Sequence, residues 1–100
     1  MQNSPRSYYK YLIDNGYSKA ATKGILGNID VETGGTFDPS TEQNEGRGKG
    51  RGLFQHEVGG RYDTDRINLL SFSKKNKMKP NAADAQLAFM NYEMSNHPEY

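Results

Sequence analysis

The chain has 100 residues, of which 33% are apolar and 25% are charged, and its net charge at pH 7 is +1. This length suffices for one small domain with a modest core and is too short for two. The sequence has no cysteine, which excludes a disulfide framework and the usual thiolate zinc sites. Seven tyrosines, four phenylalanines and the small net charge do not fit a disordered chain. We therefore expect residues 1–100 to form a single folded domain.

The first third of the chain carries two helix patterns. Ser4-Pro5 is a favourable helix start, and apolar residues recur at helical spacing until Asn15-Gly16 ends the pattern. Ser18 can cap a second helix, whose small and inward positions are Ala21, Ile25, Asn28, Ile29 and Glu32. Gly24 and Gly27 each weaken that helix by roughly 1 kcal/mol relative to alanine. We expect the close approach of another backbone to require these two glycines.

The rest of the chain predicts one β region followed by two more helices. Residues 34–60 contain eight glycines, which favours loops and a short hairpin. Asp63 or Thr64 is the predicted cap of a third helix, which ends in the basic sequence SKKNKMK. Asn81 is the predicted cap of the last helix, whose inward stripe is Ala83, Leu87, Met90 and Met94, with Phe89 and Tyr92 beside it. The pattern thus predicts a mainly helical α+β fold with a small hairpin between helices.

Two short motifs resemble metal sites but lack essential ligands. The segment HEVGG at 56–60 has no second histidine, so it cannot form the zinc-protease pattern. The segment DTD at 63–65 has neither the glycine nor the distal glutamate of a calcium loop. We predict no metal and no other cofactor.

The segment GRGKGRG at 46–52 is basic and rich in glycine. It lacks the preceding strand and the Ser or Thr of a phosphate-binding P-loop. It also has no interleaved aromatic residues on which bases could stack. We interpret it as a solvated hairpin tip, and nucleic-acid binding through Arg47, Lys49 and Arg51 is the least favoured function class.

Glu32 is the residue that points most clearly to chemistry. Ile25, Asn28 and Ile29 precede it by one and two turns, so its carboxylate leaves the helix from the apolar side. Desolvation there raises the pKa of a carboxyl group, which can then hold its proton near neutral pH. A retained proton is what a general acid needs to protonate a departing sugar oxygen. Gly34 and Gly35 then turn the chain away without covering the carboxyl group.

These residues form part of a longer pattern. The motif Glu32-x-Gly-x-x-Phe37-Asp38-Pro39, followed by GLFQ at 52–55, resembles the signature of the lysozyme superfamily, and particularly its phage tail lysozyme and lytic transglycosylase branches. The similarity continues with GGR at 59–61 and QLAFMNYE at 86–93, so it covers about residues 20–93. Similar family members often carry Trp after the Gln, where this chain has His56.

The resemblance implies a fold and an activity. It implies a small α+β lysozyme-like domain that cleaves the peptidoglycan glycan strand at the β-1,4 bond after N-acetylmuramic acid. Glu32 would be the general acid, Gln55 with the backbone around Leu53 and Phe54 would position the sugar, and Tyr62 would line the groove. Domains of this family tend to continue for a further helix, so we expect the C-terminal end to be shortened or completed by a partner.

Hydrolysis of the two-carboxylate kind needs a second acid across the bond. By proximity in sequence the candidates are Asp38, Glu42, Glu45 and Glu57, with Glu42 and Glu45 preferred because Asp before Pro commonly forms a turn. The transglycosylase route needs no second carboxylate, since the C6 hydroxyl of the muramic acid attacks instead. We favour hydrolysis because the phage-lysozyme resemblance covers more of the chain.

The N-terminal residues have no apolar stretch after a basic cluster, and no window of the chain approaches the length of a membrane span. We therefore predict neither a secretory signal nor a membrane partner. The resemblance implies a protein carried in the virion, in the phage tail, where its partners would be peptidoglycan and other tail or virion proteins. The alternative class is a non-catalytic tail component that keeps the lysozyme fold.

Overall fold

The computed structural model describes residues 1–43 and 49–96. Its elements, in chain order, are helices and strands with the following bounds: α1 Pro5–Asp14, α2 Lys19–Glu32, β1 Glu42–Gln43, β2 Gly50–Arg51, β3 His56–Glu57, α3 Leu69–Lys75 and α4 Ala83–Asn96. The strands form one antiparallel sheet in the order β1-β2-β3. The predicted mainly helical α+β fold is confirmed, and the β region is a three-stranded sheet.

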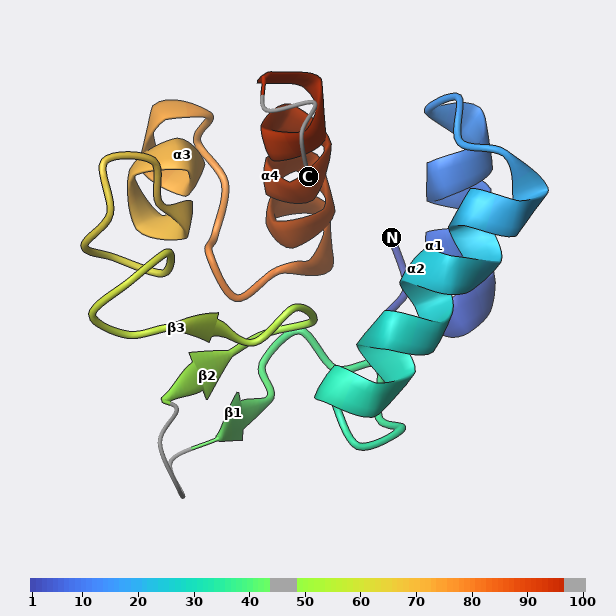
Figure 1. Cartoon of the computed structure of the whole chain (residues 1–100), viewed down its shortest axis with the longest axis horizontal. Helices are drawn as coiled ribbons and strands as arrows, with labels where there is room; N and C mark the ends of the chain where they lie inside the picture. The colour runs from blue at the N-terminus through green and yellow to red at the C-terminus, as the bar shows by residue number, and fades with distance from the viewer. Residues whose placement is uncertain (44–48, 97–100) are drawn as a thin grey trace.

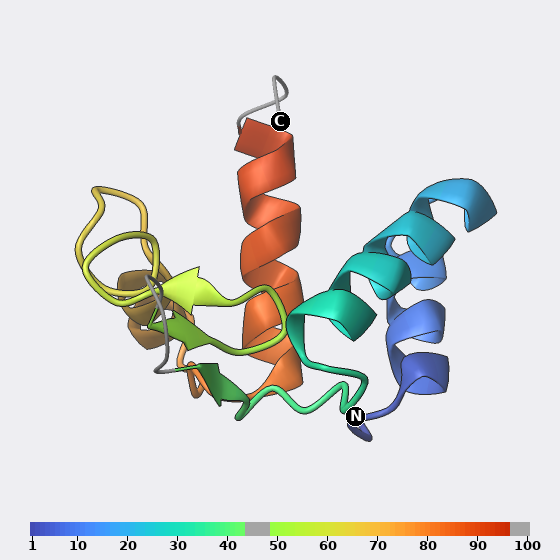
Figure 2. The same cartoon turned by 60° about the horizontal axis from the view of Figure 1, so that its bottom comes forward.

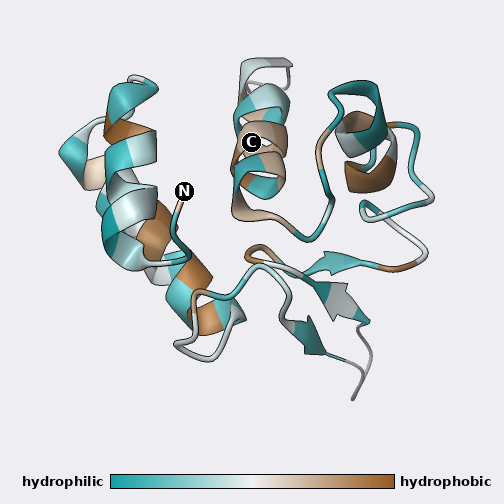
Figure 3. Cartoon of the chain, turned by 180° about the vertical axis from the view of Figure 1, so that it is seen from behind, coloured by the Kyte–Doolittle hydropathy of each residue, from teal (hydrophilic) through white to brown (hydrophobic). Residues whose placement is uncertain are grey.

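The helices form two pairs on either side of the molecule. α1 packs against α2, α3 packs against α4, and the sheet lies below the α3–α4 pair in the view of Figure 1. The C-terminal end of α2 lies beside the connection between β2 and β3, as Figures 1 and 2 both show. β1 and β3 are hydrophilic (Figure 3). The sheet is therefore short and polar, and its connecting loop is the part that reaches the core.

The caps of the first two helices agree with the sequence predictions. The Ser4 side chain accepts a hydrogen bond from the Ser7 N–H, and Pro5 occupies the first helical position. The Ser18 side chain accepts from the Ala21 N–H in the same way. Side-chain oxygens at these positions satisfy N–H groups that have no partner inside the helix.

The predicted starts of the last two helices are wrong. α3 begins at Leu69, with Asn68 as its cap, because the Asp63 carboxylate is already bound to the Gly59 N–H and the Thr64 hydroxyl in the preceding turn. α4 begins at Ala83, so Asn81 lies in the turn before it and is not the cap.

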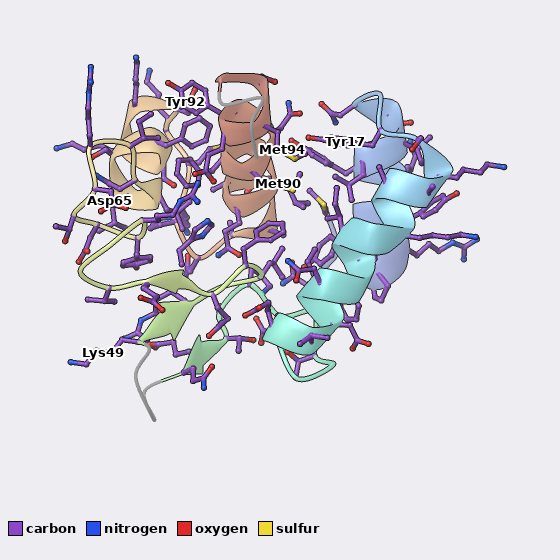
Figure 4. All side chains as sticks on the ribbon, viewed as in Figure 1. Tyr17, Lys49, Asp65, Met90, Tyr92 and Met94 are labelled. Carbon is purple, nitrogen blue, oxygen red and sulfur yellow. The ribbon has the colours of Figure 1, made fainter. Side chains whose placement is uncertain are left out.

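The core joins both halves of the molecule. Its central cluster consists of buried side chains from α1, α2, the β2–β3 connection and α4, namely Tyr8, Leu12, Ile29, Leu53, Ala83 and Leu87. Met90 packs against this cluster, but Met94 is 42% exposed, which corrects the predicted inward stripe. After Met90 in α4, the contact between the α1–α2 connection and α4 is polar. The Tyr17 hydroxyl of that connection donates to Asn91 Oδ1 at 2.9 Å and contacts Met94 Sδ at 3.8 Å (Figure 4).

The inward face of α2 also differs from the prediction. Thr22 and Ile29 are buried and Ile25 is half-buried, whereas Ala21 and Asn28 are exposed. Gly24 and Gly27 are exposed as well, and a side chain at either position would meet no atom within 4 Å. No close backbone approach therefore requires these glycines, because they lie on the outer side of the helix.

No helix in residues 1–43 and 49–96 has both the length and the apolar content needed to cross a bilayer.

Candidate functional site

Glu32 is the last residue of α2 and is half-buried. The helix ends there because the buried Thr33 side chain donates to the Ile29 carbonyl at 2.7 Å and accepts the Phe37 N–H at 3.0 Å. Gly34 and Gly35 then take left-handed backbone angles, with φ of 62° and 85°. Such angles favour glycine, and they turn the chain sharply away from the helix axis. Thr33 and the two glycines thus end the helix at Glu32.

The turn after Glu32 is attached to α1. The Tyr8 hydroxyl donates to the Phe37 carbonyl at 2.7 Å, and the two rings lie 6.3 Å apart between centroids. Burial, with a smaller contribution from the charge of Asp38, raises the pKa of Tyr8 to about 12. The Asp38 carboxylate accepts the Ser40 N–H at 2.8 Å, so Asp38 forms the turn that its position before Pro39 predicts.

The end of α2 faces the Leu53–Gln55 loop. Ile29, one turn before Glu32, belongs to the same core cluster as Leu53. Among the described residues the Glu32 side chain makes no hydrogen bond and no ion pair.

The Leu53–Gln55 loop is fixed by hydrogen bonds from the Gln55 side chain to nearby backbone carbonyls. Gln55 has a left-handed φ of 50°, and its side-chain nitrogen donates to the Gly52 carbonyl at 2.7 Å and to the Thr41 carbonyl at 3.4 Å. Its side-chain oxygen is buried and has no partner among the described residues. In this structure the Gln55 amide closes its own loop.

The predicted sugar-positioning residues do not all lie on one surface. Leu53 is fully buried, and its N–H donates to Gln86 Oε1 at 2.7 Å, so Leu53 shapes the loop from inside. Phe54 and Gln55 line a cavity of about 390 Å³ between the β3 region and α4. Tyr62 lines a different cavity of about 380 Å³.

Glu42 lines the same cavity as Tyr62, where its carboxylate lies 3.4 Å from Arg51 Nε. Arg51, half-buried, is thus paired with a carboxylate. The other preferred carboxylate, Glu45, and Arg47 of the basic segment lie outside the described residues.

Three residues in the Phe54 cavity form an arrangement that the sequence analysis missed. Arg61 forms an ion pair with Glu93 of α4, and Glu93 Oε1 lies 3.9 Å from His56 Nε2. His56 is only 8% exposed and lies 5.3 Å from the ring of Phe89. Burial, and then the positive charge of Arg61, lower the pKa of His56 to about 4. His56 is therefore neutral at pH 7 and forms part of the cavity wall.

Arg61 and Glu93 lie in the two segments, GGR and QLAFMNYE, that carry part of the family resemblance. Both residues were therefore present in recognisable motifs, but the sequence does not show that they pair, because the pair forms only in the fold. Within the described parts of the chain, no three histidine, aspartate or glutamate side chains come close enough together to hold a metal ion.

Comparison with known proteins identifies a family for the chain. A family model described as phage tail lysozyme matches residues 4–100. Searches of curated proteins and of solved structures returned no match. The family match extends over nearly the whole chain. The chain belongs to the phage tail lysozyme family.

Proposed function

We propose that this protein is a peptidoglycan-degrading muramidase carried in a phage tail or virion, and that Glu32 is its general acid. One observation carries the proposal: Glu32 is half-buried, ends α2 and has no side-chain partner among the described residues, and this end of α2 lies beside the β2–β3 connection that contains Leu53 and Gln55. Family membership supports the same reading.

The proposed reaction begins with proton transfer. Glu32 donates its proton to the oxygen of the β-1,4 bond between N-acetylmuramic acid and N-acetylglucosamine, and the bond to the anomeric carbon breaks as positive charge develops there. The end of α2 is suited to this because Thr33, Gly34 and Gly35 fix the place where the helix ends, and with it the position of Glu32. A rigidly placed acid reacts faster because less conformational freedom is lost at the moment of reaction.

The second half of the reaction has two routes. For hydrolysis we propose Glu42 or Glu45 as the second carboxylate, and the Arg51 contact at 3.4 Å supports Glu42 because it restricts where that carboxylate lies. For transglycosylation the muramic acid C6 hydroxyl attacks the anomeric carbon, gives its proton to the Glu32 carboxylate left by the first step, and forms a 1,6-anhydro sugar. We favour hydrolysis.

For the substrate we propose that Phe54 and Gln55 contact the sugar, that Leu53 supports them from the core, and that Tyr62 lines a more distant part of the groove. Phe54 is half-buried and borders an open cavity, which supports a contact between its ring and an apolar sugar face.

A second candidate function is a structural tail component that retains the fold and cuts nothing. The observation that favours it is that polar groups of the Leu53–Gln55 loop form hydrogen bonds within the protein. The Gln55 amide nitrogen and the Leu53 N–H are both bound within the protein, which leaves fewer groups for a substrate.

The experiment that tests the proposal is the digestion of purified cell walls by the folded chain. Soluble glycan fragments are measured, and their ends are identified by mass spectrometry. We expect fragments with reducing muramic ends. Predominantly anhydro ends would replace hydrolysis by transglycosylation, and no fragments from a folded chain would support the structural role.

A further inference from the structure

Gln86 is a buried glutamine at the start of α4 that hydrogen-bonds three separate segments. Its side chain is 1% exposed. Its oxygen accepts the Leu53 N–H at 2.7 Å, and its nitrogen donates to the carbonyls of Pro39 and Pro80 at 2.9 Å each. These partners fix the orientation of the amide, because only the oxygen can accept and only the nitrogen can donate.

The three partners of Gln86 are the segments whose relative position defines the candidate site. Leu53 belongs to the loop that lies beside the C-terminal end of α2, and Pro39 belongs to the connection that leaves this end. Pro80 lies in the turn that leads into α4. One side chain therefore connects the loop, the chain that follows the acid helix, and the turn into α4.

The amide of Gln86 also lies directly against the loop backbone. A side chain at Gly52 would place its Cβ 2.5 Å from Gln86 Oε1, and Gly52 has a φ of 82°. Only glycine fits both the space and the backbone angle at this position. The Gln55 side chain covers Gly50 in the same manner on the strand side of the loop. The loop from Gly50 to Gln55 is thus enclosed by two glutamine amides, each packed against a glycine.

We propose that Gln86 is the positioning residue of the candidate site, which sets the Leu53–Gln55 loop at a fixed place relative to the end of α2. Its effect on catalysis rests on the proposed function, whereas its effect on the loop does not. If Gln86 is replaced by an apolar residue of similar size, the Leu53 N–H, the buried Pro39 carbonyl and the part-buried Pro80 carbonyl lose their partner together. Buried polar groups without a partner are costly, so the loop will shift or open to reach water.

The test uses the whole chain with two substitutions at Gln86 and one control. Gln86→Met keeps the approximate size and removes all three hydrogen bonds. Gln86→Glu keeps an oxygen for the Leu53 N–H and removes the donor to the two carbonyls. Leu69→Ala is the control, because Leu69 is fully buried in α3 and does not belong to the cluster that contains Leu53.

Two readouts separate positioning from stability. The first is hydrogen exchange of the Leu53 amide, measured by NMR under conditions where all variants are folded. We expect exchange to be about tenfold faster in Gln86→Met and closer to the wild-type rate in Gln86→Glu. The second is glycan release, where we expect kcat to fall at least about tenfold in Gln86→Met with little change in KM. Leu69→Ala should lower the melting temperature without either change.

Unchanged exchange at Leu53 in Gln86→Met would overturn the proposal, whatever the activity. A kcat loss in Leu69→Ala as large as in Gln86→Met would also overturn it, because Gln86 would then act through stability alone. If Gln86→Met does not fold, a wild-type kcat in folded Gln86→Glu with fast Leu53 exchange would overturn it. If the wild-type chain releases no glycan, the proposed function fails, and the exchange measurement still decides whether Gln86 fixes the loop.

Discussion

The end of α2 and the Leu53–Gln55 loop face each other, but different kinds of contact hold them. The end of α2 depends mainly on near neighbours, since Thr33 bonds residues four positions away on either side and Gly35 bonds Asp30. The loop depends on Gln86, whose partner Leu53 is 33 residues away in sequence. Glu32 is thus held at its helix end by short-range contacts. The Leu53–Gln55 loop, in contrast, needs α4 to be packed before the Gln86 bond can form.

We therefore expect substitutions in the cavity that Phe54 lines, beside α4, to have large effects on stability, and substitutions near the end of α2 to have small ones. The following substitutions are ordered from the largest expected effect to the smallest.

His56 should make stability depend strongly on pH. Its pKa is about 4 in the folded chain against an ordinary value of 6.5. Between these values the unfolded chain binds a proton that the folded chain does not, so stability is full above about pH 6.5 and falls as the pH is lowered toward about 4, by on the order of 3 kcal/mol.

Chemical denaturation at several pH values measures this effect. His56→Gln has no imidazole to protonate. Its stability should therefore lack the fall between about pH 6.5 and pH 4 that we expect for the wild type. Parallel curves for the two proteins from pH 7 to pH 4 would contradict the neutral, buried state of His56.

Arg61→Met should destabilise the fold by on the order of 2 kcal/mol, because it leaves Glu93 without its cation. The effect is smaller than for a wholly buried pair, since the Arg61 side chain is 41% exposed. The same change should raise the pKa of His56, because the positive charge that lowers it is removed.

NMR titration of His56 measures that pKa, and denaturation measures the stability. The double variant with Glu93→Gln should recover part of the stability, since no unpaired carboxylate remains. An unchanged His56 titration in Arg61→Met would show that burial alone sets the pKa.

Tyr8→Phe should cost about 1 kcal/mol, because the Phe37 carbonyl loses its hydrogen bond. Tyr9→Phe is the matched control: Tyr9 follows on the same helix, is half-buried, and makes no hydrogen bond through its hydroxyl among the described residues. Equal melting temperatures for the two variants would show that the Tyr8 bond does not hold the turn.

Gly24→Ala and Gly27→Ala should each stabilise the protein by roughly 0.5–1 kcal/mol, because alanine favours the helix and the space around both positions is open. Gly35→Ala should do the opposite, since Gly35 has a φ of 85° and alanine disfavours left-handed angles. A loss of stability in Gly24→Ala or Gly27→Ala would contradict the open space around these two positions.

The sequence was sufficient where structure is local. Ser4 and Ser18 marked the starts of α1 and α2, and Glu32 was placed correctly at a helix end, because caps and turns depend on residues within a few positions. The sequence was insufficient where one residue could either cap a helix or form a turn. Asp63 is a good cap residue, but its carboxylate serves a turn with Gly59, and α3 begins later.

The opposite wall of the site could not be predicted for a different reason. Gln86 and Glu93 were present in the later helix pattern, yet nothing in their own neighbourhood indicates that they bind Leu53 and Arg61. The outward position of Gly24 and Gly27 was missed likewise, because helical spacing alone does not fix which side of a weakly amphipathic helix faces the core. The roles of Gln55, Leu53, Phe54, Tyr62 and Glu42 toward a sugar stay predictions.

The most direct test of the account is Glu32→Gln, which keeps the shape of the side chain and removes its acidic proton. Because Glu32 makes no hydrogen bond or ion pair among the described residues, the circular dichroism spectrum and the melting curve should be unchanged. Release of soluble glycan from purified walls should fall at least about 100-fold, as expected when a general acid is removed. Asp30→Asn, the same chemical change at an exposed position of the same helix, is the control and should retain activity. Glycan release by folded Glu32→Gln within a few fold of wild type would contradict the assignment of Glu32 as the acid.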